Sequence, residues 1–204
     1  MIKLMLAASA AVSLAASASA ITVVTSVNGP DTGIPVGQSL ITDFNTPAGL
    51  SGNYQLVTGS ISGQYAAPLG NATQYLAVLG GNTATLTLPR ALRSLSFYWG
   101  SIDEYNTVSF FNGGDLVSSF TGAQIPPAPA DGSQGDPFNN RRVNFNFGGQ
   151  SVTSVAFNSS ANSFELDTVT GAVPEPQTWA LLVFGFGMVG ATMRRRKYVN
   201  SVVS

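Results

Sequence analysis

Two acidic side chains in the last apolar–polar alternation before residue 172 have a spacing that suits acid–base chemistry. Glu165 and Asp167 alternate with Phe164 and Leu166, and alternate residues of a β-strand point to the same face. The carboxylates would lie about 6.5–7 Å apart along the strand, which overlaps their separation in inverting glycosidases. Any strand with an acidic outer face gives this spacing, so we favour a solvent-exposed face over calcium ligands, and calcium ligands over a catalytic pair.

A second acidic pair, Asp103-Glu104, follows an apolar stretch and is flanked by turn-forming residues. Asp and Asn in turns often accept hydrogen bonds from backbone N–H groups. Carboxylate oxygens also suit calcium. Calcium, held by Asp103, Glu104, Glu165 and Asp167, is therefore the one cofactor that we consider, and otherwise we expect none.

Aromatic residues crowd the stretch before this pair. Leu95, Phe97 and Trp99 share one face of an alternating pattern, which assigns them to the core. Tyr98 points to the opposite face and is the candidate ring for stacking on a sugar. Core packing remains the favoured role for the aromatic cluster as a whole.

The composition excludes several chemistries. The chain has no cysteine and no histidine, so thiol nucleophiles, disulfides, thiolate zinc sites and Ser-His-Asp triads are absent. Residues 21–173 hold four arginines against nine carboxylates, a net charge of −5. Nucleic acid is not expected as a partner, because phosphate binding requires a basic face. We expect the protein not to be an enzyme.

The elements that would position these residues are short strands. Alternating apolar and polar residues recur without helical periodicity, and Gly- and Asn-rich turns separate them. The pattern predicts an all-β domain over residues 21–171, an antiparallel β-sandwich or jelly roll, with an up-and-down barrel as the alternative. Strands are predicted at 21–27, 40–44, 54–58, 74–79, 83–88, 94–99, 107–111, 116–120, 142–147, 152–157 and 164–169, and a long loop at 125–140.

The N-terminal residues 1–20 have the pattern of a secretory signal peptide. One early cation is followed by an uncharged Leu- and Ala-rich stretch. The segment ends in small residues, with Ala18 and Ala20 at the positions that signal peptidase recognises. Export from the cytoplasm is the expected consequence.

An apolar segment over residues 178–193 precedes the basic cluster Arg194, Arg195, Arg196 and Lys197. As a helix the segment spans roughly 24 Å, enough for a thin bilayer. The positive-inside rule keeps the cations and the tail 198–204 cytoplasmic and places the β-domain outside. Gly185, Gly187 and Gly190 match the letters G-x-G-x-x-G but lack the strand and acidic residue of a dinucleotide site; in a membrane helix they permit close helix packing.

Residues 172–197 together resemble the PEP-CTERM sorting signal. The resemblance rests on Pro174, Glu175, Pro176, Trp179 and Ala180, followed by the glycine-bearing apolar segment and the basic cluster. It implies recognition by an exosortase, a membrane protease or transpeptidase of Gram-negative bacteria that make exopolysaccharide. Processing near Pro174–Pro176, a transient stay in the inner membrane and delivery to the cell surface or matrix are also implied.

Two interior segments resemble exosortase-dependent surface proteins more weakly. Residues 96–108 are similar to the central signature of one subfamily, and residues 164–169 to a closing strand that precedes the sorting signal. In those relatives the strand more often ends Asp-Asn-Val, so Thr168 is a departure. The resemblance implies an architecture and a destination but no catalytic activity.

We therefore expect an exported, structural or adhesive protein of an exopolysaccharide matrix, used for example in biofilm formation. The first alternative is a carbohydrate- or calcium-binding β-sandwich that uses the acidic residues and Tyr98. The second is a glycoside hydrolase based on Glu165 and Asp167.

Overall fold

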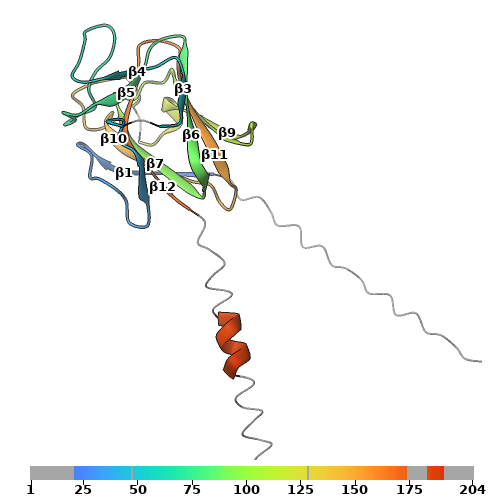
Figure 1. Cartoon of the computed structure of the whole chain (residues 1–204). Coiled ribbons are helices and arrows are strands. Elements are labelled where there is room, and N and C mark those ends of the chain that lie inside the picture. Colours follow the sequence, from blue (N-terminus) through green and yellow to red (C-terminus); the bar gives the residue numbers. More distant parts are fainter. Residues whose placement is uncertain (1–20, 47, 128, 174–182, 191–204) are drawn as a thin grey trace, which may run out of the picture.

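The computed structural model describes residues 21–46, 48–127, 129–173 and 183–190. Within these ranges, twelve β-strands form two antiparallel sheets (Figure 1). The elements are β1 (Thr22–Asn28), β2 (Ser39–Thr42), β3 (Leu50–Gly52), β4 (Gln55–Val57), β5 (Tyr75–Val78), β6 (Asn82–Leu92), β7 (Ser94–Gly100), β8 (Asn106–Asn112), β9 (Asp115–Thr121), the 3-10 helix η1 (Gly122–Gln124), β10 (Arg141–Asn146), β11 (Val152–Ser159) and β12 (Phe164–Ala172).

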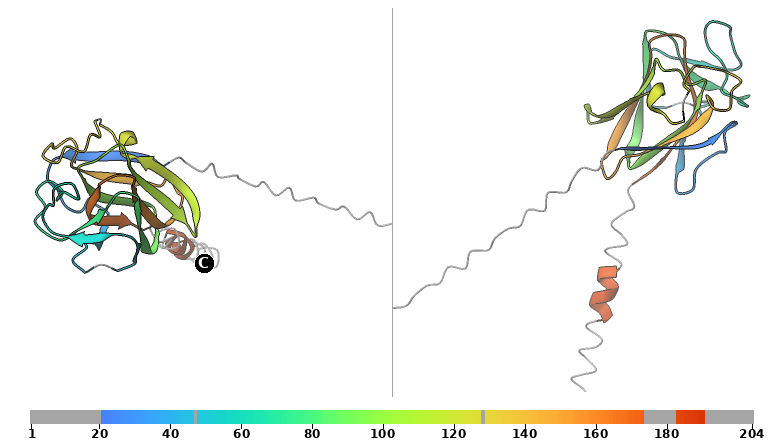
Figure 2. Two further views of the ribbon diagram at one scale, coloured as in Figure 1. Left: turned by 90° about the horizontal axis from the view of Figure 1, so that it is seen from above. Right: turned by 180° about the vertical axis from the view of Figure 1, so that it is seen from behind.

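The two sheets pack face to face as a sandwich (Figure 2). Sheet A has the order β1-β10-β7-β12-β5-β4, with β2 also paired to β12, and sheet B has the order β3-β6-β11-β8-β9. The all-β sandwich expected from the alternating patterns is confirmed. Only the three-residue strand β3 was not predicted, because its sequence Leu-Ser-Gly has no measurable alternation.

The core lies between the sheets and is rich in aromatic rings. Leu95, Phe97 and Trp99 are fully buried, as their shared face predicted. The Trp99 ring stacks on Phe164 with centroids 4.3 Å apart, and Phe97 meets Phe157 edge-on at 5.3 Å. These contacts join β7 and β12 of sheet A to β11 of sheet B, so burial of the apolar faces explains why the strands form one unit.

The strand register places both ends of the domain at the same pole. Thr22 of β1 pairs with Asn146, Asn146 with Ser94, and Ser94 with Ala172 at the end of β12. We call this end of the sandwich the exit pole. Gly100 and Glu165 pair at the opposite end, which we call the far pole. Seven residues of β12 separate the poles, a distance of about 23 Å.

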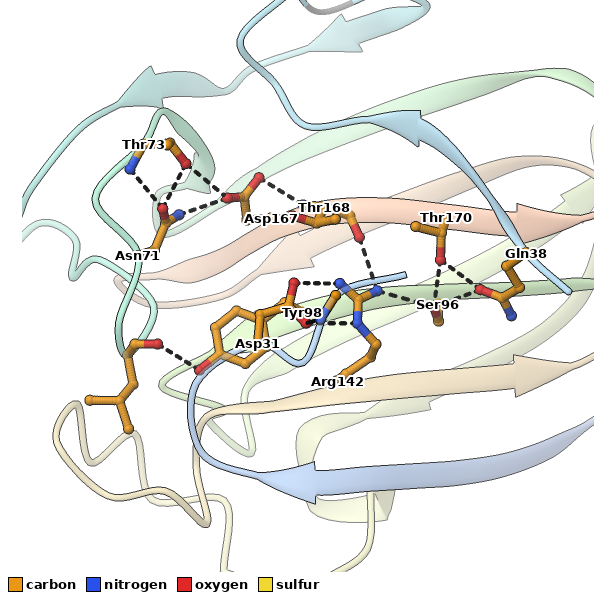
Figure 3. Close-up of polar contacts among 12 residues, drawn as sticks. Asp31, Gln38, Asn71, Thr73, Ser96, Tyr98, Arg142, Asp167, Thr168 and Thr170 are labelled. Carbon is orange, nitrogen blue, oxygen red and sulfur yellow. Dashed lines mark hydrogen bonds and ion pairs between the residues drawn. The ribbon is translucent and has the colours of Figure 1, made fainter. Parts of the chain in front are cut away.

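Segments of the protein itself cover the outer face of sheet A, and polar side chains on that face are buried (Figure 3). Arg142 is 2% exposed and donates from Nε and Nη2 to Asp31, at 2.8 and 2.5 Å. Its Nη1 donates to the Ser96 hydroxyl and to the Thr168 carbonyl, both at 3.1 Å. Asp31 belongs to the segment between β1 and β2, which these bonds hold against the sheet.

Further along the same segment, Gln38 bonds to three strands. Its Nε2 donates to Ser94 Oγ and to Asn144 Oδ1, at 3.2 and 3.0 Å. Its Oε1 accepts bonds from the hydroxyls of Ser96 and Thr170, at 2.8 and 2.6 Å (Figure 3). The polar residues of this face are therefore buried but hydrogen-bonded, as buried polar groups must be.

Strand β12 contains a bulge at the point where the neighbour on one of its sides changes from β5 to β2. Its first half pairs with β5 and its second half with β2, and the register shifts between Asp167 and Thr170. Thr168 within the bulge has φ = 48°, in the left-handed region that β-branched residues rarely adopt. Asn tolerates this region far better than Thr.

Replacing Thr168 by Asn should stabilise the protein by about 1 kcal/mol, because it relieves the left-handed strain of a β-branched residue. A urea titration gives the free energy of unfolding. Thr87→Asn, at an exposed position of β6 with negative φ, is the control and should be neutral or slightly destabilising. A Thr168→Asn variant no more stable than the wild type would contradict this explanation.

The C-terminal part is described only over residues 183–190, which form a helix. None of the helices within the described residues has the length and apolar character needed to cross a bilayer. The predicted membrane segment 178–193 extends beyond the described residues at both ends and stays a prediction. The predicted signal peptide, with Ala18 and Ala20, also lies outside them.

Candidate functional site

A pocket at the far pole collects three acidic side chains. Asp103 comes from the turn after β7, Asp131 from the loop before β10, and Glu165 from the start of β12. Ser101, Tyr105 and Ser163 complete much of the wall, and the volume is about 260 Å³. We call this the acidic pocket. Nearly all of its lining is polar, so it suits a hydrophilic ligand better than an apolar one.

The loop over residues 125–140 forms one side of the acidic pocket. Its described residues, 125–127 and 129–140, form no strand, as their Pro and Gly content predicted. Backbone N–H groups of Gly132 and Glu104 donate to the carbonyls of Ile102 and Ala130, each at 3.0 Å. Gly132 has φ = 71°, and a Cβ there would collide with the Asp103 carboxylate. The loop therefore depends on this glycine to bring Asp131 beside Asp103.

Glu165 is held at the base of the acidic pocket by neutral donors. The Ala66 N–H and the Ser101 hydroxyl donate to it, each at 2.9 Å, and the Ser163 hydroxyl donates to Oε1. The side chain is 2% exposed. Burial raises the pKa of Glu165 to about 7, against the lowering effect of these bonds. Glu165 thus exchanges its proton near neutral pH.

Asp167, two residues further on, lines a different pocket. Its Oδ2 accepts from Asn71 Nδ2 at 2.8 Å and from the Thr73 hydroxyl at 3.4 Å (Figure 3). The Thr168 N–H donates to Oδ1 at 2.7 Å. Burial raises the pKa of Asp167 to about 6. This pocket also includes Asp31 and Tyr98.

The expectation that Glu165 and Asp167 form a solvent-exposed face is therefore wrong. They are 2% and 6% exposed, because the loops before β2 and β5 lie across the outer face of sheet A. Alternation shows which side chains share a face, but not whether that face is covered. A general acid must reach its substrate, and Glu165 is almost entirely enclosed, which weighs against the catalytic pair.

The expectation that Tyr98 is exposed is also wrong. Its ring is 1% exposed, and its hydroxyl donates to the carbonyls of Gly29 and Leu69, at 2.8 and 2.9 Å. Burial raises its pKa above the usual value. Because the ring is covered by the same loops, it offers no face to a sugar.

The four residues considered for calcium are not brought together. Asp103 and Glu165 line the acidic pocket, Asp167 lines the other pocket, and Glu104 is exposed. No group of three or more acidic residues within the described ranges is placed to hold a metal ion. Sequence reasoning missed Asp131, whose partner Asp103 lies 28 positions earlier in a different turn.

Comparison with known protein families identifies a motif at the C-terminal end of the chain. Residues 172–197 match the model of the PEP-CTERM protein-sorting motif. The chain carries a PEP-CTERM sorting motif. The resemblance seen in the sequence is confirmed, and the motif implies exosortase-dependent sorting of an exported protein to the cell surface. The motif begins at Ala172, the last residue of β12.

Most side chains of the PEP-CTERM motif lie outside the described residues. These are Pro174, Glu175, Pro176, Trp179, Ala180, Arg194, Arg195, Arg196 and Lys197. Gly185, Gly187 and Gly190 lie on the helix 183–190, and a Cβ at any of them would meet open space. Their individual roles in sorting remain predictions.

Solved structures share only weak similarity with the chain. The catalytic unit of a thermostable GH87 alpha-1,3-glucanase from Streptomyces thermodiastaticus strain HF3-3 is 14% identical, with a TM-score of 0.41, over 71% of this chain and 28% of that one. A family 11 carbohydrate-binding module from Clostridium thermocellum, in complex with a beta-1,3-1,4-mixed-linked tetrasaccharide, is 14% identical, with a TM-score of 0.29, over 70% of this chain and 100% of that one. No curated protein sequence matches the chain. The sandwich assignment therefore rests on the sheet topology.

Proposed function

We propose that the chain is an exported surface protein that an exosortase processes near Pro174-Glu175-Pro176, and that its β-sandwich has a non-catalytic, structural or adhesive role in an exopolysaccharide matrix. The observation that carries the proposal is the position of the PEP-CTERM motif immediately after the closing strand. Ala172 ends β12, so processing beyond Val173 removes no strand of either sheet. The sandwich can be released whole.

The positions of the two chain ends and of the acidic pocket, at opposite poles of the sandwich, support the same proposal. The domain begins and ends at the exit pole, next to the sorting motif, and the acidic pocket lies at the far pole. While the chain is attached through its C-terminal segment, the far pole points away from the attachment. The acidic pocket is then free to contact components of the matrix.

Replacing Pro174-Glu175-Pro176 by three alanines tests the proposal in the native host. We expect full-length precursor to accumulate in the inner membrane and the surface fraction to lose the protein. Fractionation followed by immunoblotting measures both. Glu104→Ala, which removes an exposed carboxylate outside the motif, should be sorted normally. A triple-alanine variant that reaches the surface in wild-type amount would contradict processing at this motif.

The acidic pocket favours a second function, binding of a carbohydrate through its hydroxyl groups. Carboxylates are good acceptors for sugar hydroxyls, and Asp131 is exposed at the mouth of the pocket. Binding isotherms with neutral and acidic polysaccharides, with and without chelator, would separate carbohydrate binding, calcium-dependent binding and a purely structural role. Asp131→Asn should weaken binding through this pocket and leave binding elsewhere unchanged.

A further inference from the structure

The segment between β1 and β2, together with Leu40 of β2, exposes apolar side chains that the described part of the fold leaves half covered or uncovered. Ile34 is 48% exposed, Val36 fully exposed, and Leu40 47% exposed. Single exposed apolar residues are common, but neighbouring ones at a loop tip mark a binding surface. The question is therefore which partner the tip of this loop meets.

The loop tip lies at the exit pole. Gln38 bonds to Ser94, which pairs with the last residue of β12, and Ser39 pairs with Gly171, so the segment that precedes Gln38 turns at this pole. Figures 1 and 2 show this loop at the same end of the sandwich as the end of β12. A groove of about 320 Å³, lined by Leu40, Pro89, Arg90 and Val173 among others, connects the loop to the sorting motif.

The exposed positive charge of the domain lies at the same pole. Residues 21–173 contain four arginines and no lysine. Arg141 and Arg142 are buried, whereas Arg90 and Arg93 are exposed. Arg90 lines the groove, and the Arg93 N–H donates to the Ala172 carbonyl at 2.9 Å. The exit pole also carries the exposed carboxylate of Asp115, in the turn between β8 and β9, so the two arginines exceed it by one positive charge. The carboxylates of the acidic pocket lie at the far pole.

The length of chain beyond the domain limits the distance of this pole from a bilayer. Only four residues separate Val173 from Thr178, where the apolar segment begins. Even fully extended they span no more than about 18 Å. If the apolar segment is in the membrane, the exit pole lies within that distance of the lipid headgroups.

We propose that the exit pole is a membrane-docking face, in which Ile34, Val36, Leu40 and Val173 enter the interfacial region of the bilayer while Arg90 and Arg93 contact anionic headgroups. Apolar side chains flanked by cations are the pattern of interfacial binding. The inference rests on the proposed function, because the C-terminal segment must first hold the chain at the membrane. Docking orients the acidic pocket away from the lipid.

The absence of cysteine from the chain allows one environment-sensitive fluorophore to be placed at a chosen residue. Full-length Val36→Cys is labelled with a nitrobenzoxadiazole group and reconstituted in phosphatidylcholine vesicles with and without phosphatidylglycerol. Ile61→Cys is the matched control, since Ile61 is 46% exposed and its hairpin borders the acidic pocket. Quenching by spin-labelled lipid reports contact with the bilayer.

We expect blue-shifted emission and strong quenching at position 36, increased by phosphatidylglycerol, and an aqueous spectrum at position 61. Arg90→Glu should reduce the effect of phosphatidylglycerol at position 36. An aqueous spectrum at both positions in protein that floats with the vesicles would overturn docking and leave the membrane attachment intact. Protein that does not float with the vesicles would overturn the attachment, and docking with it.

Discussion

Replacing Arg142 with methionine should lower the free energy of unfolding by about 3 kcal/mol. The substitution leaves the Asp31 carboxylate, packed against the outer face of sheet A, without its positively charged partner. Arg142 binds both oxygens of Asp31 and also bonds to Ser96 and to the Thr168 carbonyl. Asp31 is 22% exposed, so water compensates in part, and the loss falls at the lower end of the range for broken buried pairs.

The adjacent Arg141 provides a matched control. It is fully buried on the core side of β10, where Nη2 donates to the Ile125 carbonyl at 2.8 Å. Its Nε and Nη1 have no hydrogen-bond partner among the residues that the structure describes. An unpaired buried charge replaced by an apolar side chain of similar length is often neutral or stabilising. Arg141→Met should therefore change stability by no more than about 1 kcal/mol, in either direction.

Urea titrations of the two methionine variants measure both effects. A double-mutant cycle with Asp31→Asn gives the coupling between Asp31 and Arg142. Equal losses for Arg141→Met and Arg142→Met would show that side-chain volume, and not the ion pair, determines stability. Such a result would contradict the conclusion that the ion pair between Arg142 and Asp31 holds the segment between β1 and β2 against sheet A.

The protein is more stable at pH 5 than at pH 8, by about 2.5 kcal/mol from Glu165 alone. Burial raises the pKa of Glu165 in the folded state to about 7, against 4.5 for the fully exposed carboxyl of the unfolded chain. The folded state thus binds more protons than the unfolded state between these values, and stability falls as pH rises through this window. Asp167, raised to about 6 from 3.8, adds a smaller loss at lower pH.

Glu165→Gln isolates this contribution. Glutamine resembles the protonated carboxyl, so the variant should match the wild type at pH 5 and exceed its stability at pH 8. The remaining pH dependence should lie below pH 6, where Asp167 titrates. Thermal unfolding at a series of pH values measures the effect. A wild-type melting temperature that rises from pH 5 to pH 8 would contradict the assigned burial of Glu165.

The strands could be predicted from the sequence because burial on one side imposes a period of two. Phe97, Phe145 and Phe164 each lie in such a pattern, and each is buried. The C-terminal motif was also recognisable, because its residues are contiguous and occur in a fixed order.

The acidic pocket could not be predicted in the same way. Asp103, Asp131 and Glu165 meet through a loop whose path depends on Gly132 and on backbone bonds with no sequence signature. The covering of sheet A depends on Arg142 and Asp31, 111 residues apart in sequence. Alternation placed Tyr98 on the face opposite Phe97 and Trp99, but only the tertiary structure shows that loops bury that face.

The intact mass of the mature protein, purified from the native host with and without its exosortase, tests the central claim most directly. We predict a product that starts near Ile21, ends between Pro174 and Pro176, and is found on the surface or in the medium only when the exosortase is present. A product that retains Arg194–Lys197 in the inner membrane, unchanged by loss of the exosortase, would contradict exosortase processing and make the C-terminal segment a permanent anchor.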